Sequence, residues 1–310
     1  GGMVVPALLY AAGLWGRPGA HGWGVPMATD IAFVVGFLTL LGPRVPGSLK
    51  VLLLTLAIAD DIGAVLVIAV VYSTGIQLLP LVLALAGLGV IALLLWLGVR
   101  SLAVYCLLGA AVWLGFFASH VHPTVAGVLL GLLAPARPDT GRPVLLDVVA
   151  DLYARLRGTQ RGTPPAAAEL LFPAEKLEGA LHPWVAFVIM PLFALANAGV
   201  RVRLDTMASR VALAVVAGLV VGKPLGVVLF SWASVRLRLA RLPEGLSWKV
   251  MLGAGCLAGI GFTMSLFVAG LAYPDAVMLD EAKVGVLAGS ALSALLGCGL
   301  LLAFLPRARP

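Results

Sequence analysis

Apolar runs long enough to cross a membrane fill almost the whole chain. A transmembrane helix needs about 17–25 predominantly apolar residues, and such runs recur from one end of the sequence to the other. Charged residues make up only 11% of the 310 residues, whereas a soluble protein has about 25%. A soluble globule of this length would lack the polar residues to cover its surface. The sequence therefore predicts an all-α polytopic membrane protein, with ten helices expected at residues 1–14, 25–42, 47–73, 77–99, 101–117, 121–135, 180–199, 207–235, 248–272 and 281–305.

The basic residues predict how these helices are oriented. Cytoplasmic loops of membrane proteins carry an excess of lysine and arginine. We expect the side with more of them to be cytoplasmic, with both termini of this chain there. Because these loops account for the net charge of +7, nucleic acid is not an expected partner. Fifteen basic residues fall on one side, namely Arg44, Lys50, Arg100, Arg137, Arg142, Arg155, Arg157, Arg161, Lys176, Arg236, Arg238, Arg241, Lys249, Arg307 and Arg309, and four on the other, namely Arg17, Arg201, Arg203 and Arg210.

One long polar linker separates the predicted spans, at residues 136–179. Its segment 144–157 has an apolar stripe at helical spacing and an Asp151–Arg155 pair one turn apart, which predicts an amphipathic helix on the cytoplasmic membrane surface. The three cysteines lie inside apolar runs without metal-ligand spacing. They are expected to be packing residues, and no cofactor is expected.

Three carboxylates inside apolar runs are the strongest functional signal. Asp30, Asp60 and Asp61 are the only acidic residues before position 139. A carboxylate at the centre of a membrane helix costs about 2.5–3.5 kcal/mol even on a lenient scale. Counted from the turn near residues 43–46, Asp30 and Asp60 each lie about 13 residues away, or roughly 20 Å along a helix, near the middle of the membrane. Lys223 reaches a similar depth on a later span.

These residues leave two interpretations open. Asp30 by itself is as consistent with capping a broken helix as with function. The adjacent Asp60–Asp61 pair with a mid-membrane Lys223 favours a pathway for ions or protons. Lys283 lies near the end of a predicted span, where its side chain can extend to the surface or take part in function.

Two predicted spans look interrupted. Residues 25–42 contain Pro26 followed by Thr29 and Asp30. Residues 248–272 contain a cluster of four glycines within the nine residues 253–261, of which Gly259 and Gly261 precede Thr263. Packing of small residues is the alternative explanation for the glycines.

Broken helices at corresponding positions of two halves are typical of secondary transporters with inverted repeats. The predicted division has a first repeat at 1–73 with its broken helix at 25–42, three scaffold helices at 74–135, the linker at 136–179, a seventh helix with its following loop at 180–206, and a second repeat at 207–310 with its broken helix at 248–272. The two broken helices are expected to cross.

The sequence closely resembles the NhaA-type sodium/proton antiporters. The resemblance rests on GWGVPMATDIAF, LTLAIADDIGAVLVIA, HPTVAGVLLG, LHPWVAFVIMPLFALANAGV, VGKPLGVVLF, LPEG, CLAGIGFTMSLFVAGLA and EAKVGVLAGS, which together extend over nearly the whole chain. It implies a transporter of the bacterial inner membrane that exchanges sodium or lithium for protons by alternating access. The family has twelve spans, so this chain is expected to begin at the third and to lack the family's first two helices, and its 136–179 loop is longer than usual.

The resemblance also implies roles for individual residues. Asp60 and Asp61 match the paired aspartates that bind the cation and exchange it for protons, and Lys223 matches the lysine that pairs with the first of them. Asp30 and Thr29 match the broken-helix position, where the acid offsets positive helix ends and the hydroxyl is a candidate sodium ligand. Lys283 and His122 match residues with modulatory roles, although a histidine at a helix end is more often a cap or a surface residue.

Sodium chemistry agrees with these roles. A hard cation prefers carboxylate, hydroxyl and carbonyl oxygens, which Asp61, Asp60 and Thr29 can supply. Sodium and protons would then compete for the same oxygens. Two alternatives remain, an intramembrane aspartyl protease and an uncoupled cation channel. A protease would place its acids on two helices, and no GxGD motif is present, so no enzyme is expected. The expected partners are the lipid bilayer, the transported ions and a second copy of the chain in a homodimer.

Overall fold

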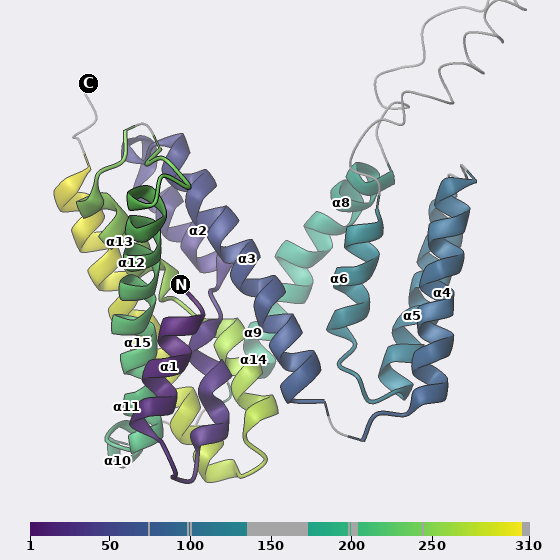
Figure 1. Ribbon diagram of the computed structural model, residues 1–310, viewed down its shortest axis with the longest axis horizontal. Helices are drawn as coiled ribbons and strands as arrows, with labels where there is room; N and C mark the ends of the chain where they lie inside the picture. Colours follow the sequence, from purple (N-terminus) through teal and green to yellow (C-terminus); the bar gives the residue numbers. More distant parts are fainter. Residues whose placement is uncertain are drawn as a thin grey trace, which may run out of the picture. The chain divides into compact units, whose positions relative to one another are not determined.

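The computed structural model describes residues 1–73, 75–97, 99, 101–134, 173–197, 199, 204–243 and 245–305. The described residues form helices joined by short turns, without any strand (Figure 1). Six of these helices are long and apolar enough to cross a membrane, or seven if one bent pair counts as a single span. The protein is therefore an all-α, multi-pass membrane protein, as predicted. The amphipathic helix expected at 144–157 lies outside the described residues.

The chain divides into two compact units, residues 1–73 with 192–310 and residues 74–191. The first unit joins the two ends of the sequence. Its helical elements are α1 (Val4–Gly13), η1 (Ala20–Met27), α2 (Ile31–Leu40), η2 (Gly42–Arg44), α3 (Gly47–Val71), α10 (Leu204–Met207), α11 (Arg210–Ala217), η5 (Gly218–Gly222), α12 (Lys223–Arg236), α13 (Trp248–Ala258), α14 (Phe262–Ala272) and α15 (Ala276–Phe304).

Two apolar clusters hold the first unit together. One joins α2 and α3 to α12, α13 and α15, and includes Leu38, Leu53 and Leu257. The other joins α1 and η1 to α11, α14 and α15, and includes Tyr10, Val215 and Leu266. In both clusters, helices from the start of the chain pack against helices from its end. This packing brings residues more than 160 positions apart into one site.

The second unit contains α4 (Leu78–Trp96), α5 (Leu102–Ala118), α6 (Thr124–Leu133), α8 (Pro173–Trp184) and η4 (Val185–Ile189). Its core is apolar and includes Leu88 of α4, Phe116 of α5 and Ala126 of α6. Gly115 lets α5 approach α4 closely, because a Cβ at this position would lie 2.9 Å from the Cβ of Ala84. After η4, α9 (Met190–Asn197) continues the chain from this unit into the first.

Both expected interruptions are present. Between η1 and α2 the backbone is extended, with φ −73° and ψ 150° at Ala28 and φ −86° and ψ 99° at Asp30. Between α13 and α14 the helix stops at residues 259–261 and the axis bends by 48°. We call these the first break (residues 28–30) and the second break (residues 259–261).

The glycines of the second broken helix divide into two kinds. We expected four glycines within nine residues to unwind the chain, but Gly253 and Gly255 lie inside α13. A Cβ at Gly253 would lie 3.0 Å from Leu301, and one at Gly255 would lie 2.9 Å from Pro224. These two positions are therefore small because neighbouring helices pack closely there. Gly259 and Gly261 alone among the four belong to the break.

Candidate cation site

Asp30 lies in the first break and caps two helices. Its Oδ1 accepts the backbone N–H of Phe33 at 3.3 Å, which makes Asp30 the N-cap of α2. Its Oδ2 accepts the backbone N–H of Thr263 at 3.0 Å and the Thr263 hydroxyl at 2.5 Å. Helix N-termini carry partial positive charge from unpaired N–H groups. One buried carboxylate, 1% exposed, therefore faces the positive ends of both α2 and α14.

Direct hydrogen bonds tie the two breaks together. The backbone N–H of Asp30 donates to the Ile260 carbonyl at 2.6 Å, and the Ser265 hydroxyl donates to the Val25 carbonyl at 2.7 Å. Each bond joins a residue in or beside the first break to one in or beside the second. A continuous helix would use these backbone groups internally, so it is the interruptions that make them available to each other.

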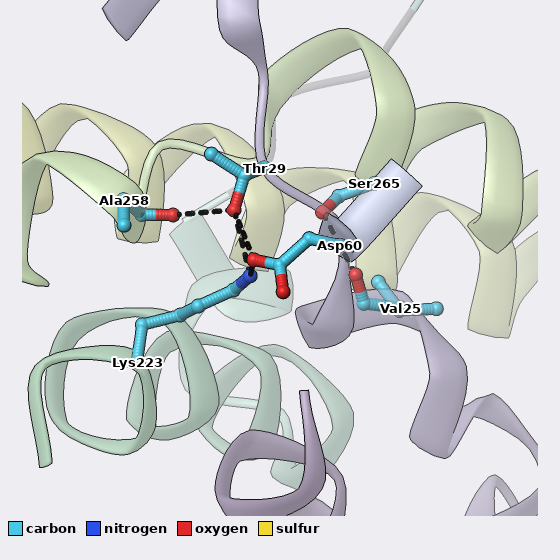
Figure 2. A network of polar contacts seen from close by, with 6 residues as sticks. All are labelled: Val25, Thr29, Asp60, Lys223, Ala258 and Ser265. Carbon is cyan, nitrogen blue, oxygen red and sulfur yellow. Dashed lines mark hydrogen bonds and ion pairs between the residues drawn. The ribbon is translucent and has the colours of Figure 1, made fainter. Parts of the chain in front are cut away.

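A buried ion pair lies next to the two breaks. Lys223 Nζ is 2.6 Å from Asp60 Oδ2, and the two residues are 0% and 3% exposed. Figure 2 shows Lys223, Asp60 and Thr29 pointing toward one another from α12, α3 and the first break. Lys223 Nζ also donates to Thr29 Oγ1 at 2.7 Å. The Lys223–Asp60 pair that the resemblance implied is thus present in the structure, and Thr29 lies beside it.

The Thr29 hydroxyl connects this ion pair to the second break. Its oxygen accepts from Lys223 and lies 2.9 Å from Asp60 Oδ2 and 3.0 Å from the Ala258 carbonyl (Figure 2). A hydroxyl carries one hydrogen, so Thr29 donates either to Asp60 or to Ala258. Because Ala258 is the last residue of α13, its carbonyl belongs to a negative helix end.

Local backbone geometry positions Lys223. The five residues before it form the π-helical turn η5, and the Lys223 N–H bonds to the Gly218 carbonyl. Pro224 follows and has no N–H, so the ordinary helical ladder is interrupted at this point. Single π turns are frequent at functional sites. Here the turn carries Leu219 to the second break, where a Cβ at Gly259 would lie 2.4 Å from the Leu219 carbonyl oxygen.

Asp61 differs from its neighbour. Successive residues of a helix are rotated by about 100° from one another, so Asp61 does not share the direction of Asp60. It is partly exposed, and within the described part of the chain its carboxylate has no hydrogen-bond or ion-pair partner. The described residues also contain no group of three His, Cys, Asp or Glu side chains suited to a metal ion. A cation here would therefore need hydroxyl or carbonyl oxygens beside the carboxylates.

The two predicted modulatory residues lie outside this hydrogen-bond network. Lys283 of α15 donates to the Gly199 carbonyl at 3.3 Å. His122, in the second unit, contacts Thr124 at the start of α6, where its Nδ1 is 2.8 Å from Thr124 Oγ1 and 3.4 Å from the Thr124 nitrogen. Both positions agree with local structural roles, and their modulatory roles stay predictions.

Two contacts at the second break were not predicted from the sequence. Thr263 hydrogen bonds to Asp30 through both its backbone and its hydroxyl, and a threonine in the first turn after a glycine break was the available signal. Ser290 of α15 accepts two backbone N–H groups of the break. Nothing in the local sequence distinguishes it from a packing serine, because its partners are about 28 residues away.

Comparisons with known proteins agree with the architecture. The chain matches the family model described as Na+/H+ antiporter 1 over residues 1–301. It is 50% identical to the Na(+)/H(+) antiporter NhaA of Rhodopirellula baltica over 318 residues, covering 99% of this chain and 72% of that protein. It is 46% identical to Na(+)/H(+) antiporter NhaA 2 of Vibrio vulnificus, covering 96% and 69%, and 48% identical to NhaA 2 of Acidiphilium cryptum, covering 99% and 70%. The chain therefore belongs to the Na+/H+ antiporter 1 family, whose named members are transporters and not enzymes.

Proposed function

We propose that this chain exchanges sodium or lithium for protons across the bacterial inner membrane, with cation and protons competing for the Asp60–Asp61 site. The observation that carries the proposal is the buried Lys223–Asp60 ion pair, 2.6 Å long, beside the two breaks, with Thr29 Oγ1 accepting from Lys223 and 2.9 Å from Asp60 Oδ2. A buried charge pair costs desolvation energy and is weak evidence for stability alone. Inside a membrane it favours a functional role.

Competition between ions follows from the oxygens that Lys223 occupies. Its ammonium hydrogen bonds to Asp60 Oδ2 and Thr29 Oγ1, and these are oxygens of the kind that sodium prefers. Sodium would bind Asp61 and then draw on Asp60 and Thr29 as Lys223 leaves them. A proton on either carboxylate would remove the negative charge that attracts the cation. Cation binding and protonation would therefore exclude each other.

Lys223 is our candidate for the second proton carrier. Exchanging more protons than sodium ions in each cycle requires two titrating groups. Asp61 would supply one, and the other would be Asp60 or Lys223. Once separated from Asp60, a buried ammonium in apolar surroundings can release its proton. If Lys223→Gln retained fully electrogenic exchange, measured as a sodium-driven membrane potential, this assignment would be wrong.

Alternating access would use the two breaks. Their half-helices are linked at mid-length by hydrogen bonds rather than by continuous helical backbone, and a few such bonds can exchange partners more readily than a helix can bend. The repeats at 1–73 and 207–310 would run in opposite senses around this crossing. We further propose that both termini are cytoplasmic, that residues 74–135 form a scaffold for a homodimer, and that Lys283 and His122 modulate exchange.

Coupled flux in proteoliposomes tests the proposal. With a pH gradient imposed, sodium or lithium should collapse the gradient and potassium should not. Asp61→Asn should abolish the response, because the amide removes the negative charge. Asp275→Asn is the matched control, since this exposed aspartate caps α15 through the Met278 N–H and asparagine caps equally well. Sodium entry without proton counterflow would indicate a channel, and an unaltered response in Asp61→Asn would exclude the proposed site.

A further inference from the structure

Ser290 of α15 holds the start of α14. Its Oγ accepts the backbone N–H of Gly261 at 3.3 Å and that of Phe262 at 3.1 Å. The side chain is 5% exposed, so water from outside does not replace these bonds. A serine oxygen has two lone pairs and can accept both N–H groups at once. Ser290 therefore caps α14 from a different helix, although Gly261, the N-cap residue by position, has no side chain to do so.

Ser290 and Asp30 divide the capping of α14 between them. The first N–H groups of a helix have no partners within it. Ser290 accepts those of Gly261 and Phe262, and Asp30 accepts that of Thr263. A neutral hydroxyl and a carboxylate thus satisfy three successive donors. This division leaves Oδ1 of Asp30 directed at its own helix, toward Phe33.

The same bonds connect Ser290 to the ion pair. Without the serine oxygen, the N–H groups of Gly261 and Phe262 would have no acceptor. They directly precede the Thr263 N–H, which already donates to Asp30. A buried unpaired donor is costly, so these groups would compete for the Asp30 carboxylate. Asp30 directly follows Thr29, whose hydroxyl oxygen accepts from Lys223 and lies 2.9 Å from Asp60 Oδ2. A displacement of Asp30 would therefore also move Thr29 and change the positions of the oxygens in the cation site.

We propose that Ser290 is a positioning residue of the cation site. It fixes the N-terminal end of α14 so that Asp30, and through it Thr29, keep the geometry that binds the transported cation. The inference rests on the proposed antiport. It adds a residue that sets the affinity of the same site, although its helix, α15, supplies none of the predicted cation ligands.

The chain offers a matched control on the same helix. Ser293 is three residues further along α15 and is 0% exposed. Its hydroxyl has no hydrogen-bond partner among the described residues. It also lies beside the second break, since a Cβ at Gly259 would lie 2.6 Å from its oxygen. Ser290→Ala and Ser293→Ala remove the same atom from buried positions beside the break, but only the first removes hydrogen bonds to Gly261 and Phe262.

The test measures exchange rate against sodium concentration in proteoliposomes. Residues that orient metal ligands typically contribute 10–100-fold to affinity or activity, so Ser290→Ala should raise the apparent KM for sodium about tenfold, with a smaller change in the maximum rate. Ser293→Ala should leave the KM unchanged. Ser290→Thr, which keeps the oxygen, should have the KM of the wild type. Ser290→Val, which has nearly the same shape as the threonine variant but lacks the oxygen, should have the raised KM. The Thr and Val variants decide the question if the alanine variant folds poorly.

Hydrogen exchange separates this inference from the proposed function. In Ser290→Ala, the amides of the peptide containing Gly261, Phe262 and Thr263 should exchange faster than in Ser293→Ala, whether or not the chain transports sodium. Unchanged protection of these amides would overturn the positioning role. An unchanged KM in Ser290→Val, in a chain whose wild type exchanges sodium for protons, would overturn it too. A wild type that moves no protons in response to sodium would instead refute the proposed function, and hydrogen exchange would still decide whether Ser290 holds the helix.

Discussion

The two breaks are built from opposite kinds of residue. The first contains Thr29 and Asp30, whose side chains accept hydrogen bonds from Lys223, Phe33 and Thr263. The second begins and ends with glycine, at Gly259 and Gly261, and offers backbone N–H and carbonyl groups. Where the first break contributes charge and a hydroxyl, the second contributes the ends of two helices.

This difference shows how a broken helix can be stabilised inside a membrane. Unpaired backbone groups in hydrocarbon are costly, and the second break has no side chains of its own to pair them. The Gly261 N–H is satisfied by Ser290 and the Ile260 carbonyl by the backbone N–H of Asp30, both from other elements. The glycines are required for space rather than for φ, because Gly259 has an ordinary φ of −71°. Each break is thus completed by the other and by α15.

Removing the charged cap should have the largest effect. Asp30→Ala leaves the N–H groups of Phe33 and Thr263 and the Thr263 hydroxyl without their acceptor, so we expect a loss of about 3–5 kcal/mol in the free energy of unfolding. Unfolding in a denaturing detergent measures this loss. Asp275→Ala, which removes an exposed cap of one helix, should cost about 1 kcal/mol. Equal losses in the two variants would show that Asp30 caps α2 alone.

Adding a methyl group to the second break should have the next largest effect. In Gly259→Ala the new Cβ would lie 2.4 Å from the Leu219 carbonyl oxygen and 2.6 Å from Ser293 Oγ. Neighbouring backbone must move, at a cost of about 1–3 kcal/mol. Gly270→Ala is the control within α14, where a Cβ meets nothing within 4 Å, and helix propensity predicts a gain of up to about 1 kcal/mol. A tolerated Gly259→Ala would contradict the close approach of η5 to the break.

A smaller effect is expected at the hydroxyl that links the breaks. Thr263→Val keeps the backbone bond to Asp30 and removes the hydroxyl bond, so it should cost about 1 kcal/mol. Thr263→Ser keeps the hydroxyl and should recover most of this difference in thermal unfolding. A loss in Thr263→Val as large as in Asp30→Ala would mean that the hydroxyl bond, and not the backbone cap, joins the breaks.

The smallest effect is expected at His122, which precedes α6 and lies outside both breaks. Burial lowers the pKa of His122 below its ordinary value of 6.5, and its Nδ1 accepts the Thr124 N–H, a bond that protonation removes. The unfolded chain then binds the proton more readily, so stability should fall as the pH drops below about 6.5. His122→Asn keeps an acceptor but does not titrate. It should reduce the stability difference between pH 8 and pH 5 by less than about 1 kcal/mol, because the imidazole is partly exposed. An unchanged slope of stability against pH from 5 to 8 would exclude His122 as its source.

The sequence alone predicted much of this protein. Apolar runs predicted most of the helices to within a few residues, for example 47–73 for α3 (Gly47–Val71), because hydrophobic length is set by membrane thickness. They placed the starts of α8 (Pro173) and α15 (Ala276) too late. Charged residues inside those runs predicted that Asp30, Asp60, Asp61 and Lys223 lie at a similar depth, because buried charge requires compensation, and the structure pairs Asp60 with Lys223. Glycine content was a weaker guide, since Gly253 and Gly255 proved to be packing positions and Gly259 and Gly261 the break.

The tertiary structure decided which polar group contacts which. The residue pattern by itself does not assign Lys223 to Asp60 rather than to Asp61, a pairing that only the family resemblance implied. Helical rotation and the π turn before Lys223 set that geometry. The caps supplied by Thr263 and Ser290 depend on contacts between helices that are distant in the chain. The sequence thus determined which charged and polar residues lie inside the membrane and therefore need a hydrogen-bond or ion-pair partner. The packing of the chain's two ends determined their partners, since a hydrogen bond depends on position and not on order along the chain.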